Sequence, residues 1–303
     1  MSGVITTGTF PKLLFPGIRA LFGDTYNEYP PEYSDIFESL TSDKNYEEDI
    51  LVSGTGMAIA KTQGEGITYS TMRQGYIQRY LNITYALGYI ITMEEIQDNL
   101  YPKFADFRTK QLAISGRQTK ETIGANILNR AFSSSYLYGD GVALCANNHP
   151  ITGSTFSNIP TSHVDLSEAA LEDGLIAIQN FRNDAGLRKR IIGMKLIVPP
   201  ALDFEAARIL KNPLRPATAE RDINAMYTNG MLPGGYVVNH YLTDPDAWFI
   251  QTDCPQGLQF FQRMEPTFDM DNDFDTKNAK FSYIERYSFG ATDPRAVLGS
   301  QGA

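Results

Sequence analysis

Hydrophobic and polar residues alternate most regularly near the C-terminal end of the chain. Four aromatic residues mark this segment: Phe281, Tyr283, Tyr287 and Phe289. Their period of two predicts a strand with one aromatic face. Glu285 interrupts that face, and a carboxylate among rings needs a partner, so we expect an Arg or Lys from another segment or subunit to pair with it. The strand is expected to close the fold or to join two chains, with Glu285 and Arg286 as anchors.

The N-terminal segment, residues 1–46, is rich in aromatic residues but has only two short helical patterns, 16–22 and 32–40. Pro16 fits a first helical position and Gly23 fits a C-terminal cap. Such a segment cannot bury its rings within itself, so it must lie along another surface, either of its own domain or of a neighbouring subunit. Its candidate contact residues are Phe10, Phe15, Phe22 and Tyr29.

Two extended patterns, 48–52 and 75–91, enclose a glycine-rich stretch at 54–66. This arrangement predicts a long hairpin with a loose tip. Both faces of the returning strand are only half apolar, and an isolated two-stranded hairpin is marginal in water, so we expect other packing to support it. Lys61 and Glu65, at the tip, are candidate contact residues.

A long helix is predicted after this hairpin. Thr92 and Glu95 form a capping box that starts a helix, which Pro102 interrupts. Residues 103–132 then continue as a helix of ~45 Å. Its middle, residues 115–122, is polar nearly all round, which favours a rod that bridges two regions or contacts a second chain, with Arg117 as a candidate contact. The alternative is an amphipathic helix on its own sheet.

The rest of the chain alternates between short helices and strands. Helices are predicted from Asp165 or Glu168 to Phe181 and over 200–211, and strands over 194–198, 236–240, 247–252 and 258–262. With the hairpin and the aromatic strand, this order predicts an α+β fold.

Composition narrows the class of protein. A chain of 303 residues with 42% hydrophobic content can form one large domain or two. Its 26 Lys and Arg against 35 Asp and Glu give a net charge of -9, which excludes a chain-wide cationic surface for nucleic acid. Two cysteines without a CxxC pair argue against a disulfide scaffold and fit a reducing cytoplasm. Neither an export signal nor a membrane span is expected.

Candidate chemistry is weak throughout. Four aspartates at 269, 271, 273 and 275 resemble the start of a calcium loop, but Phe274 and Lys280 occupy the positions that require Gly and Glu. Cys145, His149, His240 and Cys254 lack the spacing of a zinc module. A soluble enzyme with a pocket around Cys145, His149 and His240 stays an alternative. We therefore expect no catalytic residue, no cofactor and no metal.

Five segments carry a resemblance to a known family: TTGTFPKLLFPGIRALFG at 6–23, YNEYPPEYSDIF at 26–37, TSDKNYEED at 41–49, RQTKETIGANILNRAF at 117–132 and ERYSFGATDPRAVLGSQGA at 285–303. In these the chain resembles the major capsid proteins of tailed bacteriophages, and among them the Mu-like major head subunit family. The segments cover both ends and the middle, so the resemblance spans essentially the whole chain.

The resemblance implies a Hong Kong 97 type capsid fold. Residues 1–46 would form the N-terminal arm and 47–91 the extended loop. Residues 92–145 and 265–303 would form the peripheral domain, with a spine helix at 103–132, and 146–264 the axial domain.

The resemblance also implies a function: self-assembly into pentamers and hexamers of an icosahedral shell that encloses double-stranded DNA, contacted weakly. Other implied partners are a portal, decoration proteins, and a scaffold and protease encoded separately. The implied location is the virion capsid, assembled in the host cytoplasm. Some relatives join subunits covalently through a loop Lys; Lys61 lies at the tip, but no motif identifies a partner for it. The nearest alternative is a shell protein of an encapsulin-like bacterial compartment, which shares the fold.

Overall fold

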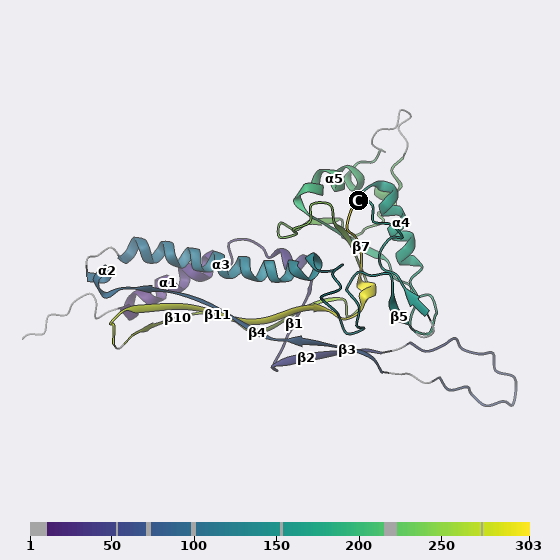
Figure 1. Cartoon of the computed structure of the whole chain (residues 1–303), viewed down its shortest axis with the longest axis horizontal. Coiled ribbons are helices and arrows are strands. Elements are labelled where there is room, and N and C mark those ends of the chain that lie inside the picture. The colour runs from purple at the N-terminus through teal and green to yellow at the C-terminus, as the bar shows by residue number, and fades with distance from the viewer. Residues whose placement is uncertain are drawn as a thin grey trace, which may run out of the picture.

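The computed structural model describes residues 11–52, 54–70, 74–97, 101–151, 154–214, 223–273 and 275–303. The described chain is elongated: a long sheet lies beneath a long helix, a second sheet with its helices stands at one end, and a hairpin projects below them (Figure 1). None of the described helices is long and apolar enough to cross a bilayer.

The first sheet has the strand order β1-β10-β11-β4. Its strands are β1 (Glu38–Thr41), β10 (Leu258–Asn272), β11 (Ala279–Ala291) and β4 (Ile83–Ile91). β1 runs parallel to β10, and the other pairs are antiparallel. Helices α1 (Pro11–Tyr26) and α3 (Tyr101–Asn129) lie side by side along this sheet (Figure 1). The sheet therefore buries one face, which explains the alternating burial along β11.

The second sheet has the strand order β12-β9-β7-β8. Its strands are β12 (Val297–Ser300), β9 (Trp248–Thr252), β7 (Gly193–Val198) and β8 (Tyr236–Val238). Helix α4 (Glu168–Gln179) packs on it at Gly174, where an added Cβ would lie 3.0 Å from the Ile250 side chain. Other helices near this sheet are η3 (Pro200–Leu202), α5 (Asp203–Lys211), α6 (Ala225–Thr228) and η4 (Pro294–Ala296).

The remaining elements are short or project from the body. Strands β2 (Tyr46–Val52) and β3 (Gln74–Leu81) pair as an antiparallel hairpin, and β5 (His149–Ile151) pairs with β6 (Ser154–Phe156). Helix η2 (Glu32–Asp35) follows α1, and α2 (Met93–Gln97) precedes α3. Thr92 and Glu95 form the predicted capping box, since each side chain accepts the other's backbone N–H.

Two glycines let α3 approach the aromatic face of β11. A Cβ added at Gly116 would lie 2.8 Å from Cε1 of Tyr283, and one added at Gly124 would lie 3.2 Å from Cε1 of Phe289. Glycine costs a helix about 1 kcal/mol relative to alanine. At these two positions the absence of a side chain permits close contact between helix and sheet, which offsets that cost.

Several predicted elements need correction. The first helix is longer than 16–22, and Gly23 lies inside it instead of capping it. Of the helix predicted over 32–40, only the single turn η2 forms, because 38–41 pairs with β10 as a strand. The cap of α4 is Ser167, whose hydroxyl accepts the N–H of Ala170, and not Asp165.

The extended run predicted over 75–91 is two strands that separate at Asn82. β3 pairs with β2 in the hairpin, whereas β4 pairs with β11 in the first sheet. The strand predicted over 258–262 continues to Asn272 and belongs to the first sheet, although the resemblance implied that residues 146–264 form the axial domain. Likewise β12 belongs to the second sheet, although the resemblance implied that residues 265–303 share the peripheral domain with the long helix. Both differences arise because β10 and the C-terminal residues connect the two sheets.

Candidate functional site

A buried charged group joins the N-terminal segment, α3 and the first sheet. We call it the Glu285 cluster; its members are Tyr26, Lys120, Gln262, Tyr283 and Glu285. Glu285 is fully buried on the aromatic face of β11. Lys120 of α3 donates from Nζ to Glu285 Oε1 at 2.5 Å, and both side chains are almost inaccessible to solvent. The predicted cationic partner of Glu285 is therefore present, within the same chain.

Neutral donors satisfy the rest of the Glu285 carboxylate. Tyr26, at the end of α1, donates to Oε2 at 3.0 Å, and Tyr283 donates to the same oxygen. Gln262 of β10 donates to Oε1 at 3.0 Å and accepts a hydrogen bond from Lys120 at 2.8 Å. Four segments distant in sequence thus converge on one carboxylate, and such a buried network is stable only when its members are satisfied together.

Aromatic rings surround the ammonium group of Lys120. Its Nζ lies 5.1 Å from the ring centre of Tyr33, 4.7 Å from that of Phe260 and 5.2 Å from that of Tyr287. Burial lowers the pKa of Lys120, and the negative charge of Glu285 opposes that shift. Burial raises the pKa of Tyr33 to about 12, and it also raises the pKa of Tyr26 and of Tyr283, which the Glu285 charge reinforces.

A second carboxylate holds the segment that follows α1. Glu121 of α3 is buried and accepts the backbone N–H groups of Glu32 and Tyr33 at 3.1 and 3.0 Å. Arg117 pairs with Glu121 at 3.2 Å and donates to the carbonyls of Tyr26 and Tyr29. Burial raises the pKa of Glu121, while these hydrogen bonds and Arg117 oppose the shift. The polar middle of α3 therefore lies on its own chain and binds the N-terminal segment there.

Arg286 fixes the point where the extended run divides. Its Nε donates to the carbonyl of Asn82 at 3.0 Å, and its Nη2 donates to the Asn45 side chain. Ser288 donates to the Asn82 side-chain oxygen at 3.0 Å, while the Asn82 amide nitrogen donates to Ser42 at 2.8 Å. These bonds position the base of the hairpin against β11.

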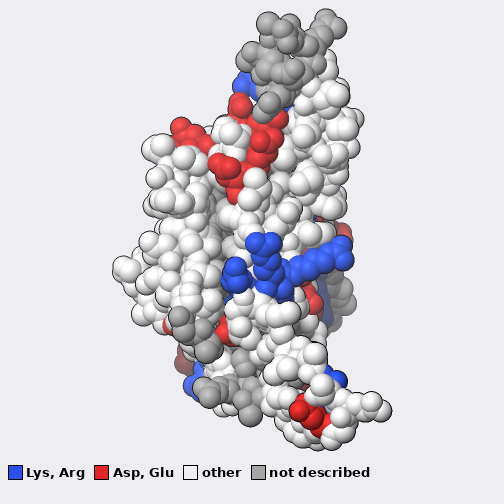
Figure 2. Space-filling model, turned by 90° about the vertical axis from the view of Figure 1, so that its right-hand side faces the viewer, with Lys and Arg blue, Asp and Glu red and all other residues white. Residues whose placement is uncertain are grey.

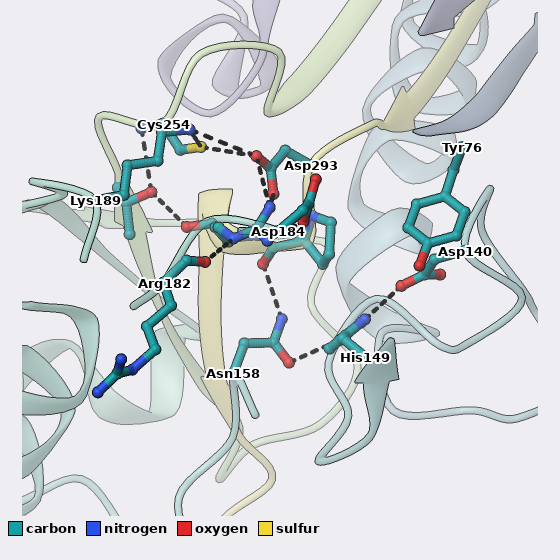
Figure 3. Close-up of polar contacts among 12 residues, drawn as sticks. Tyr76, Asp140, His149, Asn158, Arg182, Asp184, Lys189, Cys254 and Asp293 are labelled. Atoms are coloured by element: carbon teal, nitrogen blue, oxygen red, sulfur yellow. Dashed lines mark hydrogen bonds and ion pairs between the residues drawn. The ribbon is translucent and has the colours of Figure 1, made fainter. Parts of the chain in front are cut away.

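The hairpin is attached to the body at its base by a polar network (Figure 3). Tyr76 of β3 donates to the Pro150 carbonyl at 2.7 Å, and the Tyr80 hydroxyl lies 2.5 Å from that of Thr292. His149 lies between Asp140 and Asn158, with its ring nitrogens 2.6 and 3.1 Å from their oxygens (Figure 3).

The Asn158 amide extends this network to the C-terminal end of the chain. Its nitrogen donates to the carbonyls of Leu144, Pro294 and Val297 at 2.7 to 3.0 Å. Arg295 binds Asp293 and Asp184, at 3.2 and 2.7 Å. Hydrogen bonds therefore connect the base of the hairpin to the second sheet.

Beyond its base, the hairpin exposes large apolar side chains. Between β2 and β3 these are Met57, Ile59, Ile67 and Tyr69, each at least 68% accessible. Lys61 and Glu65 are also exposed there, and Glu65 accepts a hydrogen bond from Thr62. Exposing such apolar side chains to water is unfavourable for an isolated chain, so this surface is suited to burial against another molecule.

The N-terminal candidates are divided between buried and exposed positions. Phe22 is buried and stacks on Phe268 of β10, at 5.0 Å between ring centres. Tyr29 is 72% exposed. Phe15 lies on α1, but its side chain is outside the described part, and Phe10 lies outside the described residues. Phe22 therefore packs on its own chain, and Tyr29 stays available for another.

The cysteines and histidines do not form one site. Cys145 is buried, and burial raises the pKa of its thiol. His240 is bound to Glu32 at 2.8 Å, and Cys254 lies 3.3 Å from Lys189 and 3.2 Å from Asp293. Burial raises the pKa of the Cys254 thiol to about 12, so it is a poor nucleophile. Within the described ranges, no three His, Cys, Asp or Glu side chains form a set that could hold a metal ion.

Sequence reasoning missed Lys120 and Gln262. A signal for Lys120 was present: it lies four residues from Gly116 and four from Gly124, on the helix face where both glycines permit close contact with the sheet. Gln262 had no such signal, because its role depends on the pairing of β10 with β11.

The sequence matches the family model for phage capsid proteins over residues 79–299. No curated protein matches it. Among solved structures, a virus-like particle from Pyrococcus furiosus is 13% identical with a TM-score of 0.56, over 94% of this chain and 98% of that chain. The bacteriophage JBD30 procapsid is 13% identical with a TM-score of 0.54, over 98% and 76%. The SrpI encapsulin complex from Synechococcus elongatus PCC 7942 is 10% identical with a TM-score of 0.53, over 90% and 88%. At these identities the likeness is one of fold.

Proposed function

The chain belongs to the phage capsid protein family and is a capsid shell protein with the Hong Kong 97 type fold, and we propose that its copies assemble as pentamers and hexamers of an icosahedral head. The observation that carries this proposal is the projecting hairpin, whose base is fixed to the body while its tip exposes four large apolar side chains. A surface of this kind is stable in water only when a neighbour covers it.

The same proposal assigns a role in the shell to each segment of the chain. Residues 1–46 act as the arm, 47–91 contain the extended loop, and 103–132 contain the spine helix of the peripheral domain, with the axial domain built around 146–264. Tyr29, Lys61 and Glu65 contact neighbouring subunits, since they are exposed. Phe22, Arg117, Glu285 and Arg286 act indirectly, because they hold the arm and the base of the loop within their own chain. We also propose that, within the phage capsid proteins, this chain is one of the Mu-like major head subunits.

The protein is a structural subunit, and we infer that it carries no enzymatic activity of its own. We further infer that it encloses double-stranded DNA with weak contacts, since a net charge of -9 does not favour tight binding to phosphates. A separate scaffold, a protease and a portal complete the proposed assembly in the host cytoplasm.

Electron microscopy of the expressed protein, alone and with its scaffold, tests the proposal. Shells, capsomers or tubes are expected. Monomers that persist under both conditions would refute it. An encapsulin-like compartment is the second candidate, because the Synechococcus complex shares the fold. The neighbouring genes distinguish the two: portal and terminase genes indicate a phage head, whereas a peroxidase or ferritin-like cargo indicates a compartment.

A further inference from the structure

One exposed loop has a charge opposite to that of the whole chain. We call residues 182–190, between α4 and β7, the basic loop; it contains Arg182, Arg188, Lys189 and Arg190 against a single acidic residue, Asp184. Figure 2 views the end of the molecule that carries α4 and β5, and a group of Lys and Arg side chains lies in the middle of that face. In a chain of net charge -9, such a concentration of cations requires a specific reason.

Hydrogen bonds hold the backbone of the basic loop in place, while the side chains of Arg188 and Arg190 are exposed. A β-bridge joins Arg182 and Arg188, and Asn183 donates its N–H to the Leu187 carbonyl at 2.7 Å. Arg295 donates to the Arg182 carbonyl at 2.8 Å, which fastens the loop to the C-terminal region. Arg188 and Arg190 are exposed, and neither forms an ion pair or hydrogen bond within the described part of the chain.

A complementary segment lies at the opposite end of the molecule. We call residues 269–271 of β10 the acidic strand end; it contains Asp269 and Asp271, both exposed and without an ion pair among the described residues. The β10–β11 turn that follows lies far from α4 and β5 (Figure 1). The two charged segments therefore cannot meet within one chain, but they can meet between two copies arranged head to tail.

The spacing of the charges matches. Arg188 and Arg190 flank the half-buried Lys189, and Asp269 and Asp271 flank the half-buried Met270. In an extended backbone, residues two apart point to the same side and are separated by roughly 6.5 to 7 Å. Two arginines can therefore face two aspartates in register, as two separate Arg–carboxylate pairs.

We propose that the basic loop of one copy binds the acidic strand end of a second copy, as a head-to-tail contact of the shell. The inference rests on the proposed function and adds the surface that selects the neighbour. Exposed ion pairs add little affinity singly, so this contact sets register and partner while apolar burial elsewhere supplies the affinity. Nucleic acid is the competing occupant of the basic loop, but it would leave the matched aspartates unexplained.

Charge reversal tests the contact. Arg188→Glu with Arg190→Glu, and separately Asp269→Arg with Asp271→Arg, are expected to reduce shell yield at least ten-fold, and all four changes in one chain are expected to restore it. Arg208→Glu with Lys211→Glu on α5 is the matched control for net charge. Circular dichroism verifies folding of each variant. Pair variants that assemble like the wild type, or four changes that restore nothing, would overturn the inference.

Cross-linking separates this inference from the proposed function, because it does not require complete shells. Arg190→Cys subunits mixed with Asp269→Cys subunits are expected to form disulfide-linked heterodimers, and Arg190→Cys mixed with Asp106→Cys is not. The native cysteines are buried and do not interfere. Cross-linking no stronger than in the control would refute the head-to-tail contact even if wild-type shells form. Loss of binding to a short DNA duplex in Arg188→Glu with Arg190→Glu, with normal assembly, would instead assign the loop to nucleic acid.

Discussion

Replacing Lys120 by methionine tests whether the Glu285 cluster holds the first sheet and its helices together. The substitution shortens the unbranched side chain by one atom and leaves the carboxylate of Glu285, which is 0% accessible, without its cation. Breaking a buried ion pair from one side costs about 3 to 5 kcal/mol. Tyr26, Tyr283 and Gln262 still donate to the carboxylate, so we expect the cost to lie near about 3 kcal/mol.

The double variant isolates the pairing from packing. Lys120→Met combined with Glu285→Gln removes both charges, while the new amide can still accept from the tyrosines. The removal of a whole buried pair is often neutral, so we expect the double variant to recover at least about 2 kcal/mol relative to Lys120→Met alone. The cycle therefore measures the coupling energy between the two side chains.

Urea unfolding of unassembled subunits is the assay. Circular dichroism at 222 nm follows the whole chain, and the single tryptophan, Trp248, reports the second sheet, where it is buried. With a slope of about 3 kcal/mol per molar urea, a loss of 3 kcal/mol lowers the midpoint by about 1 M. A midpoint that falls by less than about 0.3 M, or a double variant whose loss equals the sum of the single losses, would refute the reasoning.

Four further predictions concern the same region. Burial raises the pKa of Tyr283 and of Tyr287 above the unfolded value of about 10. Both tyrosines therefore contribute fully to stability below pH 10, and above it the free energy of unfolding falls by about 1.4 kcal/mol per pH unit per tyrosine. Urea midpoints from pH 9 to 11.5 measure this fall, and constant midpoints would contradict it. Tyr283→Phe removes a hydrogen bond to the buried carboxylate and costs about 1 to 3 kcal/mol, whereas Tyr287→Phe costs less, because that hydroxyl forms no hydrogen bond with a described residue; equal urea midpoints would argue against the difference. Gly116→Ala lowers stability by about 1 to 3 kcal/mol through a clash with the ring 2.8 Å away, whereas Gly23→Ala, with nothing within 4 Å, raises it by up to about 1 kcal/mol; thermal unfolding would show both variants to be more stable than the wild type if the glycines only weaken the helices. Deletion of residues 1–40 leaves the second sheet folded, as tryptophan fluorescence would show, but prevents shell formation; unchanged particles in the microscope would disprove the role of the arm.

The strand β11 was predictable from its period of two, and the long helix α3 was predictable because residues 103–132 contain no helix breaker except two glycines. The face that carries Phe281, Tyr283 and Tyr287 is buried as the period of two required. The need of Glu285 for a cation was also predictable, since a carboxylate on that face cannot remain unpaired. The identity of its partner was not, because Lys120 is 165 residues away and is brought near only when α3 packs on the sheet.

Outside the hairpin, which strands pair with one another could not be predicted from the sequence. Residues 75–91 read as one continuous strand, yet the chain divides at Asn82, whose side chain bonds to Ser42 and Ser288 and directs β3 and β4 to different partners. The helical pattern predicted over 32–40 does not extend past η2, because residues 38–41 pair with the edge of β10 as a parallel strand. Local propensity is weak compared with the backbone hydrogen bonds of a sheet edge, so tertiary context decides such segments.

The sequence by itself determined the classes of element, the buried aromatic face, the need for a cation at Glu285, the absence of a recognisable catalytic motif and, through whole-chain resemblance, the family. Only the tertiary structure decided which elements share a sheet, which cation meets Glu285, and that the basic loop and the acidic strand end lie at opposite ends of the molecule. The physical reason is one of range. Periodicity and composition act over a few neighbouring residues, whereas the pairing of β10 with β11 and the docking of α3 depend on contacts between segments that the sequence places far apart.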